Sequence, residues 1–273
     1  KTGRHVPFIT TLHGTDITLV GKDKTYEPVV TFSINESDAI TAVSKNLRDE
    51  TYHSFAIEKD IEVIYNFVDV SRFNKKPIDA FRKVIAPHGE KILMHASNFR
   101  KVKRIPDVIQ IFNKIQQNIP AKLMMVGDGP EKEKAEALCQ KLGIQDKVIF
   151  FGNSNEIDKI LSYSDLFLLP SETESFGLAA LEAMAWSVPV VSSNSGGLPE
   201  VNFEGVSGYL SDVGNVDDMA ENALKILENE TILNEFKANA LSVAKQFDIK
   251  NILPLYEDLY RLAIQNSKSI VQS

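Results

Sequence analysis

The stretch Asp165-Leu-Phe-Leu-Leu-Pro170, followed closely by Glu174-Ser-Phe-Gly-Leu-Ala-Ala-Leu-Glu182, decides the fold. The first part is a short apolar run that is typical of a buried strand, and the second begins a helix. A polar loop joins the two parts. The unpaired amides and the dipole at the start of such a helix favour an anion there. Glu174 and Glu182 stand about 12 Å apart along this segment at the helical rise per residue.

That spacing suits a ligand with hydroxyl groups at both ends and a diphosphate between them, which describes a nucleotide sugar. Taken singly, Gly177 is typical of close packing, and Glu182 is typical of a solvated surface. The combination with a preceding strand and with basic residues elsewhere in the same domain favours a binding site.

From residue 90 onward, short apolar runs alternate with amphipathic segments. The apolar runs, which predict strands, are Ile92–Ala96, Lys122–Val126, Val148–Phe151, Leu166–Leu169, Val188–Val191 and Gly208–Leu210. The segments with helical periodicity are Ile105–Gln117, Glu131–Leu142, Asn155–Tyr163, Leu178–Trp186 and Val216–Glu228. Strands that are apolar on both faces and alternate with helices predict an α/β fold with a parallel sheet covered on both sides. We expect a doubly wound domain from about residue 70 to 247.

The two ends of the chain have a different pattern. Three further strands are predicted at Pro7–Leu12, Ala39–Val43 and Glu62–Tyr65, with a helix at Lys45–Ser54. These elements make half of a second sheet domain. The segment Asp248–Gln265 carries an apolar stripe at helical spacing, and Pro254 is expected to kink or restart that helix.

Composition narrows the class of protein. The 273 residues are 43% hydrophobic and 25% charged, which is ordinary for a globular protein. A net charge of −7 without a basic stripe argues against a nucleic-acid partner. Cys139 is the single cysteine and is expected to be buried and unreactive, so a reducing compartment is indicated. No membrane-length apolar run or signal peptide is present, and we expect a cytoplasmic protein without membrane insertion.

Four segments should meet at the carboxyl edge of the predicted sheet, where ligand sites of such folds lie. They are Ser97–Arg104, Gly127–Pro130, Glu174–Glu182 and Ser195–Glu200. The first carries basic side chains that could neutralise phosphate. His13 follows the first predicted strand beside a glycine, a place where the backbone is open to a ligand.

Several motifs are absent. The sequence has no Asp-x-Asp pair, no cluster with zinc-ligand spacing and no Gly-x-Gly-x-x-Gly motif. We therefore expect neither a metal nor a bound cofactor. A leaving diphosphate would be stabilised by amides and basic side chains instead.

Together these segments resemble the retaining glycosyltransferases of the GT-B group, in the family called type 4. The signature of that family is a pair of glutamates separated by seven residues, matched here by Glu174 and Glu182. The resemblance implies two Rossmann-like doubly wound domains, of which the N-terminal one is incomplete in this chain. It divides the chain into a partial acceptor domain at 1–67, a nucleotide-sugar domain at 68–247, and a helix at 248–273 that returns to the first domain.

The resemblance also implies roles for individual residues. The catalytic group would comprise His13, Arg100, Lys103 and Glu174. The donor would be bound by Asn98, Gly152, Asn153, Ser154, Ser175, Phe176, Gly177, Leu178, Ala179 and Glu182. Gly14, Thr15, Lys45 and Arg48 are candidates for the acceptor.

The activity that the resemblance implies is transfer of N-acetylglucosamine from UDP-N-acetylglucosamine to the hydroxyl of L-malate, the first step of bacillithiol synthesis. Alternatives are a family 4 enzyme with another acceptor, a UDP-sugar 2-epimerase, or an inactive donor-binding module. The oligomeric state is left open, with a homodimer among the options.

Three departures from the family pattern matter. Asn98 stands where the family usually has an arginine, so either Arg100 substitutes for it or that charge is lost. The sequence Ala185-Trp186-Ser187 replaces the usual Ala-Cys-Gly and is expected to alter packing. The glycine-rich loop near the family's N-terminus has no counterpart, so the chain is expected to begin midway through the acceptor domain.

Overall fold

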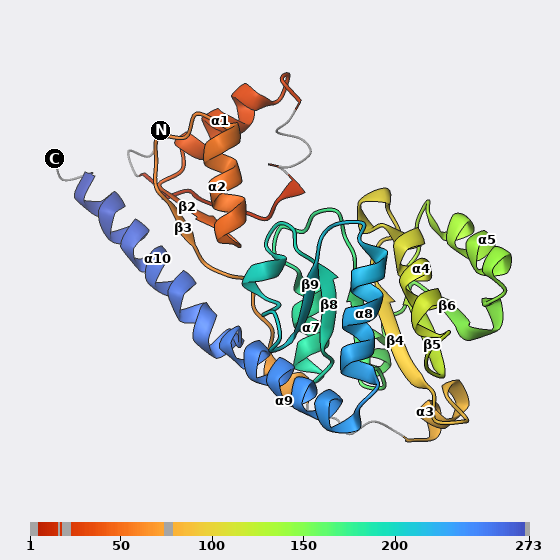
Figure 1. Cartoon of the computed structure of the whole chain (residues 1–273). Coiled ribbons are helices and arrows are strands. Elements are labelled where there is room, and N and C mark those ends of the chain that lie inside the picture. Colours follow the sequence, from red (N-terminus) through yellow and green to blue (C-terminus); the bar gives the residue numbers. More distant parts are fainter. Residues whose placement is uncertain (1–4, 16, 18–22, 74–78, 271–273) are drawn as a thin grey trace. The chain divides into compact units, whose positions relative to one another are not determined.

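The computed structural model describes residues 5–15, 17, 23–73 and 79–270 of the chain. The chain forms two compact units (Figure 1). One comprises residues 68–246, and the other comprises residues 1–67 together with 247–273. Each unit is described separately.

The larger unit contains a sheet of six parallel strands in the order β6-β5-β4-β7-β8-β9. The strands are β4 (Lys91–Ala96), β5 (Ala121–Val126), β6 (Val148–Gly152), β7 (Leu166–Leu169), β8 (Val190–Ser193) and β9 (Gly208–Ser211). The chain first builds outward from β4 on one side and then outward from β7 on the other. The order therefore reverses between β4 and β7, which makes their carboxyl ends the topological switch point.

Helices connect or flank these strands. They are α3 (Asp79–Ile85), α4 (Ile105–Ile115), α5 (Lys132–Leu142), α6 (Ile157–Leu161), α7 (Leu178–Ala185), α8 (Val216–Leu227) and α9 (Glu230–Gln246). Short 3-10 turns lie at Val70–Phe73, Lys101–Lys103, Gln145–Lys147 and Leu198–Glu200. The predicted α/β fold with a doubly wound parallel sheet is confirmed.

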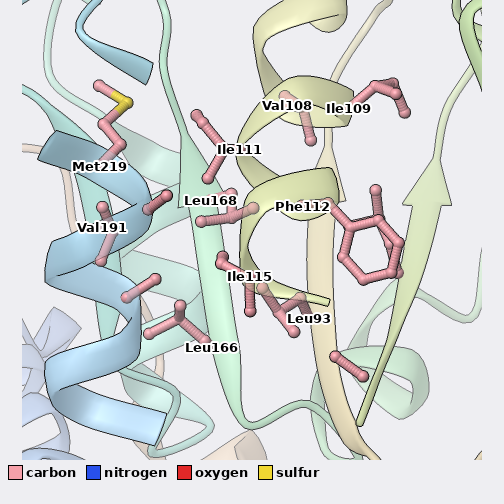
Figure 2. Packing of buried hydrophobic residues seen from close by; sticks show 14 of the residues in the cluster. Leu93, Val108, Ile109, Ile111, Phe112, Ile115, Leu166, Leu168, Val191 and Met219 are labelled. Atoms are coloured by element: carbon pink, nitrogen blue, oxygen red, sulfur yellow. The ribbon is translucent and has the colours of Figure 1, made fainter. Parts of the chain in front are cut away.

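A core cluster of this unit lies between the sheet and the helices α4 and α8 (Figure 2). On α4, Val108, Phe112 and Ile115 are fully buried at helical spacing. They pack over Leu93 of β4 and Leu168 of β7, as Figure 2 shows. Burying each such side chain contributes about 1.5–3 kcal/mol, so this layer fixes the strands and their carboxyl ends.

The smaller unit contains three parallel strands in the order β1-β2-β3: β1 (Ile9–Leu12), β2 (Ala39–Ala42) and β3 (Ile61–Val63). Its helices are α1 (Glu27–Asn35), α2 (Lys45–Ser54) and α10 (Ile249–Ile270). The Ser44 hydroxyl caps α2 by accepting a hydrogen bond from the Leu47 amide at 3.0 Å. The Tyr256 hydroxyl of α10 donates to the Ile64 carbonyl at 3.2 Å, which ties this last helix to the chain after β3.

Some expectations need correction. The helix α10 is not restarted at Pro254, since it runs without interruption from Ile249 to Ile270. Pro254 and Lys250 are both exposed, so water can satisfy the carbonyl that the proline leaves without a donor. The strand predicted at Val188–Val191 begins and ends two residues later, because Ser192 and Ser193 are buried and hydrogen-bonded.

Other boundaries also differ from the sequence prediction. The strand expected at Glu62–Tyr65 lies at Ile61–Val63, and the helices α1, α3 and α9 were not predicted. Two helix ends have capping residues: Asn215 caps α8 by accepting from the Asp218 amide at 3.3 Å, and Gly143 ends α5 with a φ of 67°.

Candidate functional site at the carboxyl end of the sheet

Two loops meet at the switch point, one after β4 and one after β7. Residues 97–104 follow β4, and residues 170–177 lead from β7 into α7. The two loops are joined directly, because the Glu172 amide donates to the Val102 carbonyl at 2.8 Å. The segments 97–104 and 174–182 thus lie side by side.

The Gly127–Pro130 turn packs against the loop after β4. A Cβ atom on Gly127 would lie 1.8 Å from the Ser97 carbonyl oxygen, so only glycine allows this approach. The Glu131 amide donates to the Phe99 carbonyl at 2.9 Å. The turn is therefore part of the scaffold that shapes the site.

The segment 195–200 supports the loop after β7 in the same way. The Gly197 amide donates to the Glu174 carbonyl at 2.8 Å. A Cβ atom on Gly196 would lie 2.1 Å from that same carbonyl oxygen. All four predicted segments consequently meet at one edge of the sheet.

Lys103 and Glu174 form an ion pair at the centre of this edge. The Lys103 Nζ atom lies 2.5 Å from Glu174 Oε1, and the Ser171 hydroxyl donates to the same oxygen at 2.8 Å. The side chains of Lys103 and Glu174 are 21% and 15% exposed. Both remain within reach of a ligand while being shielded enough for their charges to act strongly.

Asn98 and Arg100 flank this pair in the loop after β4. Both are exposed, and neither side chain makes a hydrogen bond or ion pair with the residues that the structure describes. Phe99 between them is fully buried and anchors the loop. The guanidinium of Arg100 is thus a free cation in the described part of the site.

The start of α7 offers backbone donors to an anion. Gly177 adopts a φ of 101° at the N-cap, where a Cβ atom would lie 2.7 Å from a side-chain carbon of Leu198. No described side chain caps this end of α7, and its first turn holds no acidic residue. Leu178 is exposed and Ala179 partly exposed, whereas Phe176 is buried and Ser175 half-buried. The positive end of the helix dipole is therefore open to a negative charge.

Glu182 lies further along α7 in a different environment. Burial raises the pKa of its carboxyl group, the negative charge of Asp158 raises it further, and Arg72 opposes both effects. The Arg72 guanidinium also lies 3.8 Å from the Asp158 carboxylate. Two acids and one cation therefore gather at this end of the site, away from the Lys103–Glu174 pair.

The residues 152–154 connect β6 to the helix that carries Asp158. The Gly152 carbonyl accepts from the Gly127 amide at 2.8 Å, and Gly152 has a φ of 66°. The Ser154 hydroxyl accepts from the Glu156 amide, and Asn153 is exposed.

The remaining predicted residues belong to the smaller unit. His13 follows β1 and is exposed, and the buried Gly14 has a φ of 123°. Lys45 begins α2 just after β2, and the Arg48 guanidinium donates to Asp49 at 2.8 Å. Because β1 and β2 are parallel neighbours, these residues lie at the carboxyl edge of that sheet, together with the exposed Thr15.

Comparison with known protein families decides the class of protein. Residues 78–243 match the model of "Glycosyl transferases group 1", and residues 1–72 match "Glycosyltransferase Family 4". The chain is a glycosyltransferase of this family.

Named relatives agree with this assignment. The glycosyltransferase is 42% identical over 269 residues to N-acetyl-alpha-D-glucosaminyl L-malate synthase of Bacillus anthracis. The matched region covers 98% of this chain and 71% of the relative. It is 31% identical over 179 residues to D-inositol 3-phosphate glycosyltransferase of Mycolicibacterium smegmatis. This matched region covers 62% of this chain and 40% of the relative.

Solved structures identify the fold as GT-B. The structure of HepE from Anabaena in complex with UDP and glucose matches with a TM-score of 0.83 at 23% identity, covering 93% of this chain and 71% of that one. A complex of TarM from S. aureus with UDP matches with a TM-score of 0.78 at 22% identity, covering 93% and 50%. At these identities the likeness shows the fold alone.

The sequence missed His95, which lies fully buried in β4 of this glycosyltransferase. Its Nδ1 atom lies 2.9 Å from the Leu168 carbonyl oxygen, which can only accept, so Nδ1 carries the proton. Nε2 of the neutral ring then accepts from the Ser97 hydroxyl at 2.8 Å. Burial, together with the charge of Lys103, lowers the pKa of His95 to about 4. The sequence feature that could have identified His95 is a histidine inside an apolar predicted strand.

Other observations bear on single predictions. Cys139 is buried, and burial raises the pKa of its thiol to about 11, so its predicted burial is confirmed. None of the helices in the described ranges is long and apolar enough to cross a membrane. Those ranges also contain no group of three His, Cys, Asp or Glu side chains that could hold a metal ion.

Proposed function

We propose that this glycosyltransferase moves N-acetylglucosamine from UDP-N-acetylglucosamine to the hydroxyl of L-malate, with retention of anomeric configuration and without a metal ion. The assignment of a nucleotide-sugar donor rests on the convergence of Lys103 and Glu174 at the uncapped start of α7. The malate half is supported by the 42% identity to the L-malate synthase over almost the whole chain.

In this proposal the donor extends along the start of α7. The diphosphate accepts hydrogen bonds from the amides of Leu178 and Ala179 and faces the positive end of the helix. Glu174 accepts from the hexose hydroxyls, and Glu182 accepts from the ribose hydroxyls. The uracil lies by residues 152–154, whose loop leads into the helix that carries Asp158. The UDP and glucose named in the HepE complex support this class of donor.

The chemistry requires stabilisation of charge on the leaving group. The bond between the sugar C1 and the diphosphate oxygen breaks, and a bond from C1 to the malate hydroxyl oxygen forms on the same face. The hydroxyl proton moves to an oxygen of the departing phosphate. Lys103, Arg100 and the α7 amides stabilise the charge that develops there. No protein nucleophile takes part.

The acceptor is proposed to meet the smaller unit. L-malate carries two carboxylates, which call for cationic or amide donors. Lys45 and Arg48 supply cations beside β2, and Gly14 and Thr15 supply backbone amides after β1.

The proposal is tested by product analysis with the intact protein. With UDP-N-acetylglucosamine and L-malate we expect UDP and a product of the mass of N-acetylglucosaminyl malate, with an α-anomeric proton coupling and unchanged rates in EDTA. Release of UDP without malate would indicate an epimerase. Binding of UDP with no transfer to malate or to other hydroxy acids would indicate a donor-binding module.

A pair of neighbouring lysines gives a matched test of the catalytic assignment. Lys103→Ala should lower kcat about a hundredfold, the scale of losing one charge-stabilising group in a shielded site. Lys101→Ala removes an exposed lysine from the same 3-10 turn and should leave kcat near the wild-type value. Equal rates for the two variants would contradict the role of Lys103.

A further inference from the structure

Ser171 occupies a fixed position beside the sugar-binding carboxylate. It is the second residue after β7 and is fully buried, and its hydroxyl donates to Glu174 Oε1 at 2.8 Å. Its carbonyl accepts a hydrogen bond from the buried Ser193 hydroxyl of β8. The serine therefore stands on the rigid edge of the sheet and has little freedom to turn away from Glu174.

The main chain of Glu174 is held on both sides as well. The Glu172 amide donates to Val102, and the Glu174 carbonyl accepts from Gly197. Two donors, Ser171 and Lys103, converge on Oε1 of the carboxylate. Within the described residues, the second oxygen, Oε2, receives no hydrogen bond. The carboxylate thus has one fixed oxygen and one that can accept from a ligand.

The two donors to Oε1 differ in what a diphosphate does to them. Lys103 carries a mobile ammonium on a four-carbon stem, and a bound diphosphate attracts that charge away from Glu174. Ser171 is neutral and buried, so a diphosphate does not draw it away. Once the donor substrate is bound, the serine is the partner that continues to hold Oε1.

We propose that Ser171 is a positioning residue that keeps the Glu174 carboxylate aimed at the hexose while Lys103 turns to the diphosphate. The inference rests on the proposed function, in which Glu174 accepts from the hexose hydroxyls. It makes Ser171 a determinant of affinity for the sugar part of the donor, with no part in holding UDP.

The experiment compares binding of UDP-N-acetylglucosamine with binding of UDP, by calorimetry on the intact protein without acceptor. Ser171→Ala should weaken binding of the nucleotide sugar about tenfold, the effect of losing one hydrogen bond to a charged group. UDP affinity should stay at the wild-type value, because UDP has no hexose. Ser207→Ala is the matched control: it removes another fully buried hydroxyl, just before β9 at the opposite edge of the sheet, and should change neither affinity.

A double-mutant cycle separates positioning from a general structural role. If Ser171 acts through Glu174, then Ser171→Ala should have no further effect on nucleotide-sugar affinity in a Glu174→Ala background. Additive losses, or equal losses of UDP and nucleotide-sugar affinity, would overturn the inference. So would wild-type affinity of Ser171→Ala alongside weakened binding by Glu174→Ala. If Glu174→Ala itself binds the nucleotide sugar normally, the proposed donor site fails instead.

Discussion

Gly196 illustrates how single residues set the position of Glu174. Its φ of 60° lies in the left-handed region, and a Cβ atom there would be 2.1 Å from the Glu174 carbonyl oxygen. Gly205 has a similar φ of 70°, yet a Cβ atom on it would meet nothing within 4 Å. The two glycines share a backbone conformation and differ in what surrounds them.

We therefore expect different outcomes for the same substitution at the two sites. Gly205→Ala should lower the free energy of unfolding by about 1–2 kcal/mol because of the left-handed backbone, and Gly196→Ala should lower it by more, because its Cβ atom also meets the Glu174 backbone. Only Gly196→Ala should also displace Glu174 and weaken binding of the nucleotide sugar, by about tenfold or more on the scale of one charged hydrogen bond. Urea unfolding and calorimetry measure the two effects. Equal binding by both variants would contradict the steric explanation.

At the scale of elements, His95 joins the two central strands across the switch point. It belongs to β4, while its Nδ1–H donates to the Leu168 carbonyl of β7. The same ring accepts from Ser97, the first residue of the loop that carries Lys103. The ring must be neutral to make both bonds, which agrees with its lowered pKa.

This arrangement predicts a dependence of stability on pH. The folded pKa of His95 is lowered to about 4, whereas an unfolded histidine titrates near 6.5. Between these values the unfolded chain binds a proton that the folded chain does not, so stability falls as pH falls. The loss should be on the order of 3 kcal/mol, at about 1.4 kcal/mol per unit of pKa.

The measurement is urea unfolding at pH 7 and pH 4.5. His95→Gln should flatten the dependence on pH relative to the wild type, because the side chain no longer titrates. His53→Gln, which removes an exposed histidine in α2, should keep the wild-type dependence. A wild-type slope in His95→Gln would show that His95 is not the responsible group.

At the scale of the whole molecule, the unit of residues 68–246 carries its own core and its own complete sheet. Its first and last helices are tied to the sheet by the buried Asp165. That carboxylate pairs with Arg82 of α3 and Lys237 of α9, and accepts from the Ile92 amide. Burial raises the pKa of Asp165, but the two cations outweigh it and hold the pKa below its usual value.

We expect a fragment of residues 68–246 to unfold cooperatively and to bind UDP with near-wild-type affinity, without transferring sugar to malate. A fragment of 68–228 lacks α9 and leaves Asp165 without Lys237, so it should not fold. Circular dichroism with thermal unfolding and UDP titration test both fragments. Failure of the longer fragment to fold would show that the smaller unit is needed for its stability.

The sequence by itself determined the alternation of strands and helices from residue 91 to 227, with β7 placed correctly at both ends. It also identified Lys103, Glu174 and Glu182 as candidates. These features are readable because apolar runs, helical periodicity and the spacing within one segment are local properties of the chain.

Only the tertiary structure decided which side chains act together. Lys103 and Glu174 are 71 residues apart in sequence, and His95 meets Leu168 across 73 residues. Ser171 shows no pattern that separates it from any other serine after a strand. Its hydroxyl reaches Glu174, three residues on, because contacts with Val102 and Gly197 fix the fold of their loop. The order of the strands brings the distant loops to one edge, because that order buries the apolar faces of the sheet.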